Sequence, residues 1–148
     1  MTASSSHNYA GDISAQEAWD LMVTEPQAQL VDVRTVAEWN FVGLPDLSEL
    51  GRRVHCIEWQ TFPDMAVNST FASQTAGVVT KAGADTDTPV LFLCRSGARS
   101  RAAAIALTGA GFAKAYNVAG GFEGDLDNAR HRGQTNGWKA AGLPWRQS

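Results

Sequence analysis

One short stretch of this 148-residue chain joins an apolar run, a cysteine and an alanine-rich run. Residues 90–93 are apolar, which predicts a buried strand, and residues 102–107 predict a buried helix that ends at Gly109 or Gly111. Cys94 opens the tight loop between them. The first N–H groups of a helix have no partner within the helix, and the helix dipole adds positive potential there. The stretch therefore predicts a strand, an anion-binding loop and a helix in direct succession.

Three of the nine arginines of the chain, Arg95, Arg99 and Arg101, lie in this loop and at the start of the helix. Cations at a helix start oppose the dipole, so their presence indicates a bound anion. The same field favours the ionised form of the Cys94 thiol, which is the nucleophilic form. The alternative is a buried structural cysteine beside ordinary surface arginines. Because cysteine, glycine, arginines and helix start coincide here, we predict that Cys94 is the catalytic residue.

Residues 94–100, Cys-Arg-Ser-Gly-Ala-Arg-Ser, resemble the active-site loop of the rhodanese family, single-domain sulfurtransferases of α/β fold. The resemblance extends upstream to residues 30–34 and Glu38-Trp39, and downstream to residues 111–112, 116–121, Trp138 and 142–144. It covers most of residues 10–145. It implies that Cys94 carries the transferred sulfur and that the substrate is bound by the rest of the loop, namely Arg95, Ser96, Gly97, Ala98, Arg99 and Ser100.

Predicted strands and helices alternate along the chain, which indicates a mostly parallel sheet covered on both faces. A capping-box pattern at Ser14 opens the first helix. The later predicted elements are strands at residues 30–33, 54–57, 90–93 and 115–118, a helix at 71–81 and a last turn at 138–141. We expect a three-layer α/β domain with about five strands, as the resemblance also implies. Residues 10–148 form this single domain, and the serine-rich residues 1–9 form a flexible tail.

Asp32 and Arg34 come at the carboxyl end of a predicted strand, which is the edge of a parallel sheet where sites form. We expect both to support the Cys94 loop from behind, Asp32 by orienting an arginine or a backbone group of that loop. An equally weighted alternative is that Asp32 caps the helical turn at residues 35–39.

Residues 54–68 contain the second cysteine and several large apolar side chains. Cys56 alternates with Val54 in its predicted strand, which favours a core position over a role as a resolving thiol for Cys94. The apolar side chains that follow have no regular period: Trp59, Phe62, Pro63 and Met65. They form either an apolar rim over the Cys94 pocket or a loop pinned to the core, and the second is slightly favoured.

Two segments depart from the rhodanese pattern. Residues 40–53 lack the Gly-His-Ile stretch that usually follows the Glu-aromatic pair, so no role of that histidine is carried over. Residues 120–137 form a long charged loop that looks like an insertion. His131 and Asp127 in this loop are too few to hold a metal ion, so we expect a solvated loop with internal ion pairs.

Composition excludes several classes of protein. The net charge of −3 gives no general attraction to nucleic acid or to an anionic membrane. No apolar run approaches the ~20 residues of a membrane span. Residues 1–9 lack the apolar segment of a secretory signal, and two cysteines suit a reducing compartment. We therefore expect a cytoplasmic protein with free thiols and with neither a metal nor a cofactor.

The expected activity is that of a thiosulfate sulfurtransferase. The Cys94 thiolate takes the outer sulfur of a small sulfane-sulfur donor, and a thiol acceptor, which can belong to a protein, or cyanide then removes it. Arg95 and Arg99 receive the anionic group of the donor. One alternative is a cysteine-loop phosphatase or arsenate reductase, although these have five residues between cysteine and arginine, against four between Cys94 and Arg99. The other is a sulfur carrier or partner-binding module without rapid turnover.

Overall fold

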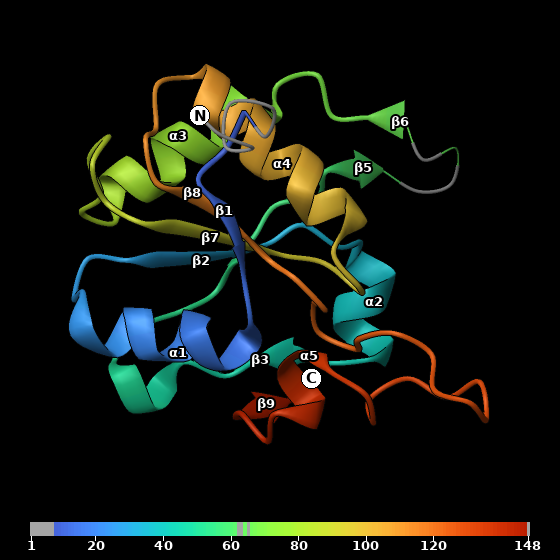
Figure 1. The fold of residues 1–148 in the computed structure, drawn as a ribbon. Coiled ribbons are helices and arrows are strands. Elements are labelled where there is room, and N and C mark those ends of the chain that lie inside the picture. Colours follow the sequence, from blue (N-terminus) through green and yellow to red (C-terminus); the bar gives the residue numbers. More distant parts are fainter. Residues whose placement is uncertain (1–7, 62–63, 65, 148) are drawn as a thin grey trace.

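The computed structural model describes residues 8–61, 64 and 66–147. Its centre is a sheet of five parallel strands in the order β1-β8-β7-β2-β4 (Figure 1). The strands are β1 (Gly11–Ile13), β2 (Gln29–Asp32), β4 (His55–Cys56), β7 (Val90–Leu93) and β8 (Ala115–Val118). The predicted α/β architecture with a central sheet of about five strands is confirmed.

Helices lie on both faces of this sheet (Figure 1). Those in the described part of the chain are α1 (Ala15–Thr24), α2 (Val36–Phe41), α3 (Phe71–Lys81), α4 (Ala98–Gly109) and α5 (Gly137–Ala140). Helices α3 and α4 pack on one face, and α1 and α5 pack on the other. Strand β7 serves both cores, because Phe92 faces α3 and α4 whereas Leu91 and Leu93 face α1 and α5. Cys94 comes next in this alternation and lies on the α3 and α4 face.

Capping boxes start the first two helices. The Ser14 hydroxyl accepts from the Glu17 amide and the Glu17 carboxylate accepts from the Ser14 amide, as predicted for α1. Thr35 and Glu38 make the same reciprocal pair at α2. Thr35, and not Asp32, therefore caps this helix.

Short antiparallel ribbons join segments outside the central sheet. Strand β3 (Leu44–Pro45) pairs with β9 (Trp145–Arg146), and β5 (Gln60–Thr61) pairs with β6 (Ala66–Val67). A 3-10 turn at Ser48–Leu50 completes the region between β3 and β4. The pairing of residues 44–45 with the end of the chain was not predicted, because nothing local in either segment indicates its partner.

Within the apolar segment at residues 58–68, residues 60–61 and 66–67 form the β5–β6 ribbon. Trp59 packs edge-on against Phe71 with 5.1 Å between ring centroids, so this side chain is pinned to the core. Phe62, Pro63 and Met65, which were also candidates for an apolar rim, lie outside the described residues.

The start of the domain differs from the prediction. Tyr9, assigned to the tail, is buried in the α3 and α4 core, and Ala10 N–H donates to Ala115 O at 2.9 Å. The assignment to a tail is therefore wrong for Tyr9. Residues 1–7, which were assigned to the same tail, lie outside the described residues. Strand β1 was not predicted either, since three residues are too few to show a period.

Between β8 and α5 the described chain forms only turns, bends and irregular backbone, as predicted for the long loop after Gly120. No helix in the described residues combines the length and the apolar character needed to cross a membrane.

Candidate active site

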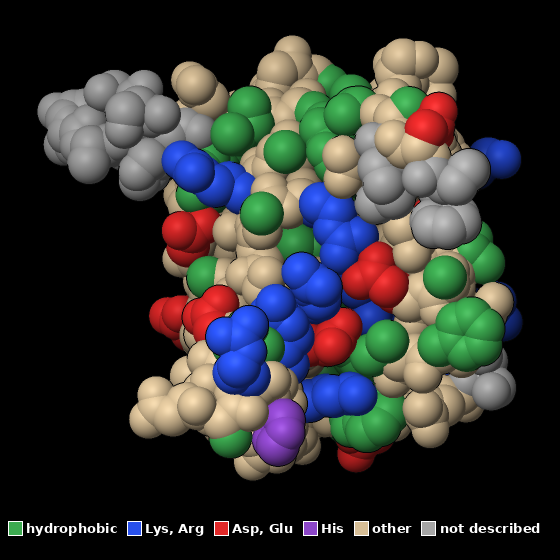
Figure 2. All heavy atoms as spheres, turned by 90° about the vertical axis from the view of Figure 1, so that its right-hand side faces the viewer, with side chains coloured by type: hydrophobic (Ala, Val, Ile, Leu, Met, Phe, Trp, Pro, Cys, Tyr) green, Lys and Arg blue, Asp and Glu red, His purple; other side chains and the backbone are tan. Residues whose placement is uncertain are grey.

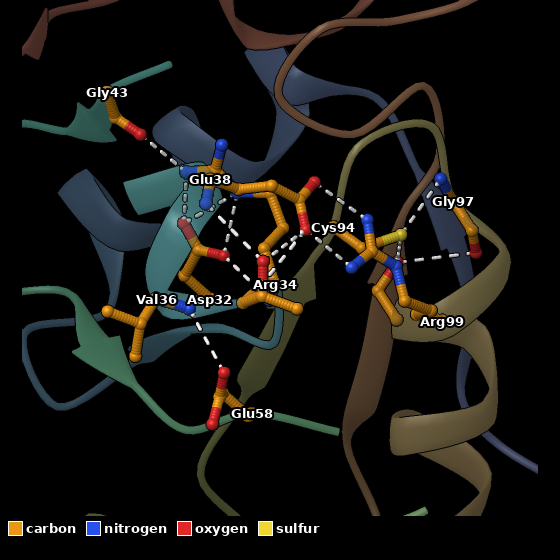
Figure 3. Close-up of polar contacts among 11 residues, drawn as sticks. Asp32, Arg34, Val36, Glu38, Gly43, Glu58, Cys94, Gly97 and Arg99 are labelled. Atoms are coloured by element: carbon orange, nitrogen blue, oxygen red, sulfur yellow. Dashed lines mark hydrogen bonds and ion pairs between the residues drawn. The ribbon is translucent and has the colours of Figure 1, made fainter. Parts of the chain in front are cut away.

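Cys94 directly follows β7, and its side chain is 1% exposed. Its Sγ accepts a hydrogen bond from Gly97 N–H at 3.1 Å, and Ser100 Oγ lies 3.2 Å away (Figure 3). Gly97 has φ +120°, a conformation that favours glycine, and this brings its amide back toward the sulfur. The loop thus curls around Sγ and brings Cys94, Gly97 and Ser100 together.

The loop also carries backbone donors that remain free. Helix α4 begins without a side-chain cap, and the N–H groups of Arg95, Ser96 and Ala98 have no hydrogen-bond acceptor among the described residues. Unpaired N–H groups at a helix start attract anions. The predicted anion-binding character of the loop therefore has a structural basis.

The segment after β8 braces the loop from outside. Phe122 N–H donates to Cys94 O at 2.7 Å, and the amides of Glu123 and Gly124 donate to Arg95 O at 3.0 and 3.1 Å. This close approach requires glycine at position 121, where φ is +62°. A Cβ at that position would lie 2.6 Å from the Arg95 carbonyl carbon and oxygen.

Arg99 forms a bidentate ion pair with Glu38 of α2. Its two terminal nitrogens lie 2.7 and 2.9 Å from the two carboxylate oxygens (Figure 3). We expected Arg99 to receive an anionic donor. In the structure, a carboxylate of the protein already occupies its two terminal nitrogens. Arg95 is exposed, and its side chain has no partner among the described residues.

Cationic side chains gather on the face that carries α2 and the start of α4, with acidic side chains among them (Figure 2). Arg101 belongs to a different neighbourhood from Arg99, since its guanidinium lies 5.8 Å from the Tyr9 ring centroid. Of the three arginines at the helix start, Arg95 is the one whose side chain has neither an ion-pair nor a ring partner among the described residues.

Asp32 and Arg34 pair with each other rather than with the Cys94 loop. Arg34 Nη2 lies 2.6 Å from Asp32 Oδ2 and donates to Gly43 O at 2.7 Å, with both ionised side chains fully buried. The Arg34 guanidinium lies 4.3 Å from the centroid of Phe122, whose amide holds Cys94 O. The expectation that Asp32 orients a group of the loop is wrong, and the support from this pair passes through Phe122.

Cys56 is exposed, so its predicted core position is wrong. It lines a surface hollow of about 620 Å³ beside Pro45, Arg53 and Arg146. Desolvation by the surrounding protein and the nearby Asp32 carboxylate raise the pKa of this thiol to about 11. A two-residue strand has no reliable alternation from which the inward face could be read.

The two thiols lie on opposite faces of the sheet. Asp32 is in register with Cys56 on one side and with Leu93 on the other, so these three side chains share a face. Leu93 packs against α1 and α5, whereas Cys94 packs against α3 and α4. The arrangement does not bring Cys56 to Cys94 as a resolving thiol.

Three residues that sequence reasoning did not place in the site also belong to it. Glu38 binds Arg99, and Asn117 Oδ1 lies 2.6 Å from Ser100 Oγ. Asp12 Oδ1 in turn accepts from Asn117 Nδ2 at 3.0 Å. Glu38 and Asn117 stand in segments that carry the rhodanese resemblance, which is the signal that could have found them, whereas Asp12 has no such signal.

The protein is thus a parallel α/β domain whose candidate site is a cysteine loop at the start of a helix. The chain matches the family model described as STR4 middle domain over residues 10–148. It therefore belongs to the STR4 middle domain family.

Several proteins resemble the chain over nearly its whole length. The crystal structure of Rv0390 from M. tuberculosis is 51% identical, with a TM-score of 0.81, and covers 95% of this chain and 99% of that chain. An uncharacterized protein of Rickettsia prowazekii (strain Madrid E) is 33% identical over 134 residues, 90% of this chain and 95% of that protein. The polysulfide-sulfur transferase homodimer from Wolinella succinogenes shares the fold, with 22% identity, a TM-score of 0.55 and coverage of 93% and 78%.

The close approach at Gly121 predicts a large cost for a side chain there. We expect Gly121→Ala to lower the free energy of unfolding by about 2–4 kcal/mol, because a Cβ adds a backbone clash to an unfavourable φ. Urea unfolding measures this. Gly51→Ala is the matched control, since Gly51 has φ +68° but nothing within 4 Å of its Cβ position. Its cost is about 1–2 kcal/mol, and equal costs at the two positions would contradict the clash.

The ion pair with Arg99 predicts a pH dependence of stability. Partial burial alone would raise the pKa of Glu38, but the hydrogen bonds and charge of Arg99, with Thr35, lower it from 4.5 to about 2. The resulting stabilisation, ~3 kcal/mol at most, is complete above pH 4.5 and is lost as the pH falls toward 2. Urea unfolding at a series of pH values should show that Glu38→Gln lacks this loss. Glu49→Gln, at an exposed position, should keep the wild-type profile, and identical profiles for all three proteins would refute the assignment.

Proposed function

We propose that this protein is a sulfurtransferase that carries a sulfane sulfur as a persulfide on Cys94. The proposal rests on the buried Cys94 sulfur, which accepts the Gly97 amide inside a loop with further unpaired N–H groups. Amide donors arranged around a buried sulfur stabilise negative charge on that atom.

In the first step, the Cys94 thiolate attacks the outer sulfur of thiosulfate or a similar donor. A new S–S bond forms at Cys94, the S–S bond of the donor breaks, and the leaving sulfite takes the electron pair. In the second step, an acceptor thiolate or cyanide attacks the outer sulfur of the persulfide. The bond to Cys94 then breaks, and the enzyme thiolate is restored.

Arg95 is the residue that we assign to the anionic end of the donor. It is exposed at the mouth of the loop and has no partner among the described residues, whereas Arg99 must first leave Glu38 to bind an anion. The unpaired amides of Arg95, Ser96 and Ala98 are available to the charge that develops on sulfur. Binding and charge stabilisation thus fall to different atoms of the same loop.

Loop size and fold support sulfur transfer over phosphate chemistry. Four residues separate Cys94 from Arg99, one fewer than in the cysteine-loop phosphatase pattern, and a smaller ring suits a single sulfur atom. The protein from W. succinogenes that shares this fold is a polysulfide-sulfur transferase, so the fold accommodates the proposed chemistry.

The nucleophile can be identified by mass. After incubation with thiosulfate, the intact protein should gain the mass of one sulfur, and cyanide should remove it as thiocyanate. Cys94→Ser should abolish the gain, and Cys56→Ser, the matched control, should retain it. If Cys56→Ser abolishes the gain instead, the site assignment is wrong.

The same proteins separate the alternatives. A persulfide that forms but is not passed on to cyanide or to any thiol would make the protein a carrier rather than an enzyme. Hydrolysis of aryl phosphates that depends on Cys94, together with failure of every sulfane donor, would assign the protein to the phosphatase class.

The role of Arg95 predicts a selective change in donor binding. We expect Arg95→Ala to raise KM for thiosulfate about tenfold with kcat little changed, as for the loss of one charge-assisted hydrogen bond. Steady-state kinetics with cyanide as acceptor measure this. Arg53→Ala removes another exposed arginine, which lines the surface hollow beside Cys56, and should leave KM unchanged. An unchanged KM in Arg95→Ala would show that other groups hold the anion.

A further inference from the structure

A line of hydrogen-bonding groups connects the Cys94 sulfur to the protein surface. Ser100 Oγ lies 3.2 Å from Cys94 Sγ and 2.6 Å from Asn117 Oδ1, and Asn117 Nδ2 donates to Asp12 Oδ1 at 3.0 Å. The groups come from α4, β8 and β1, respectively. Ser100 and Asn117 are buried, with 0% and 4% exposure, and Asp12 is exposed. An exposed carboxylate is thus connected to the sulfur through two buried side chains.

The chemistry of the three side chains fixes the direction of these hydrogen bonds. A carboxylate oxygen only accepts, so the amide nitrogen of Asn117 must face Asp12 and the amide oxygen must face Ser100. That oxygen also only accepts, so the hydroxyl must donate to it. Ser100 has one proton and three nearby acceptors, Asn117 Oδ1, Cys94 Sγ and Gly97 O, and the shortest distance is to Asn117.

We infer that Asp12 is a positioning residue for Cys94, which acts through Asn117 to turn the Ser100 hydroxyl proton away from the sulfur. In this state the sulfur faces lone pairs of Ser100, which cannot stabilise a negative charge on it. When Cys94 ionises or carries a persulfide, the hydroxyl must rotate to donate to sulfur and leave Asn117 Oδ1 without its donor. The inference rests on the proposed role of Cys94 as the nucleophile.

The network acts by orientation and does not conduct a proton. The amide of Asn117 cannot take up a proton at its oxygen and release another from its nitrogen without becoming the high-energy imidic acid. Asp12 therefore does not act as a base for Cys94. It sets how readily Ser100 can donate to a negatively charged sulfur, while the Gly97 amide donates in either state.

Other charged groups face both ends of the network. Tyr9 OH donates to the same Asp12 oxygen at 2.7 Å, and Arg101 lies over the Tyr9 ring. At the sulfur, Arg99 is paired with Glu38, and Arg95 belongs to the same loop. Asp32 and Arg34 form their own pair at the end of β2, with Asp32 on the opposite face of the sheet. Removal of the Asp12 charge alone would also favour a thiolate, so the experiment must separate charge from orientation.

Asp12→Asn provides the test. An asparagine at position 12 can donate as well as accept, so the Asn117 amide can turn over, and the Ser100 hydroxyl is then free to donate to sulfur. We expect the pH at which Cys94 alkylation by iodoacetamide is half-maximal to fall by about one pH unit, the effect of one added hydrogen bond to an ionised group. The measurement is made in a Cys56→Ser background, with the Cys94 peptide quantified by mass spectrometry.

The matched comparison is the same substitution in a Ser100→Ala background. With no hydroxyl to reorient, Asp12→Asn should then leave the midpoint unchanged. A shift that persists without Ser100 would come from charge and would overturn the inference, as would the absence of any shift when Ser100 is present. Should Ser100→Ala fail to fold, Ser100→Gly, which also lacks the hydroxyl, gives the same distinction.

Alkylation reports on Cys94 whether or not the protein transfers sulfur. If the alkylation midpoint falls as expected in Asp12→Asn but no persulfide forms, the proposed function is refuted and the inference stands. Persulfide formation with no shift in Asp12→Asn would refute the inference alone.

Discussion

The shape of the Cys94 loop depends on hydrogen bonds that it receives from residues 122–124. The amides of this segment hold the carbonyls of Cys94 and Arg95, which leaves the N–H groups of the loop free to face an anion. The Phe122 ring lies over the guanidinium of Arg34, and that guanidinium is held by Asp32 and Gly43 O. A fully buried ion pair adds little net stability, because desolvation offsets the attraction between the charges. Here the pair instead positions Phe122, whose amide holds the carbonyl of Cys94.

The loop offers less uncompensated positive charge than three arginines at a helix start suggest. Glu38 neutralises Arg99, and Arg101 lies against Tyr9. Under the proposed function, an anionic donor therefore meets the unpaired amides and Arg95, whose side chain has no partner among the described residues. In sulfur transfer the leaving group is also an anion, and a site that held donor and product equally tightly would gain nothing in turnover. The exposed arginine at the mouth, in the role proposed for Arg95, would attract the donor and still let the product leave.

Sequence reasoning succeeded where the determinants are local. The bounds of β7, α3 and β8 match the prediction because each element is a periodic or apolar run between clear turn residues. The position of the loop between β7 and α4 was predicted for the same reason. What could not be predicted depends on contacts between distant segments, such as Glu38 with Arg99, 61 residues apart, or β3 with β9. The face of Cys56 was misjudged because two residues of strand do not define an alternation.

The separation of the two thiols constrains the chemistry further. An intramolecular disulfide would remove a persulfide from Cys94 as soon as it formed, but Cys56 lies on the other face of the sheet. With its pKa raised to about 11, the Cys56 thiol is also a poor nucleophile at neutral pH. Under the proposed function, a persulfide on Cys94 is therefore discharged by an acceptor from outside and not by Cys56. Since the Cys94 side chain is 1% exposed, that acceptor must reach the outer sulfur rather than the sulfur of the cysteine itself. In the proposed reaction, burial of the nucleophile would thus direct attack to the atom that is to be transferred.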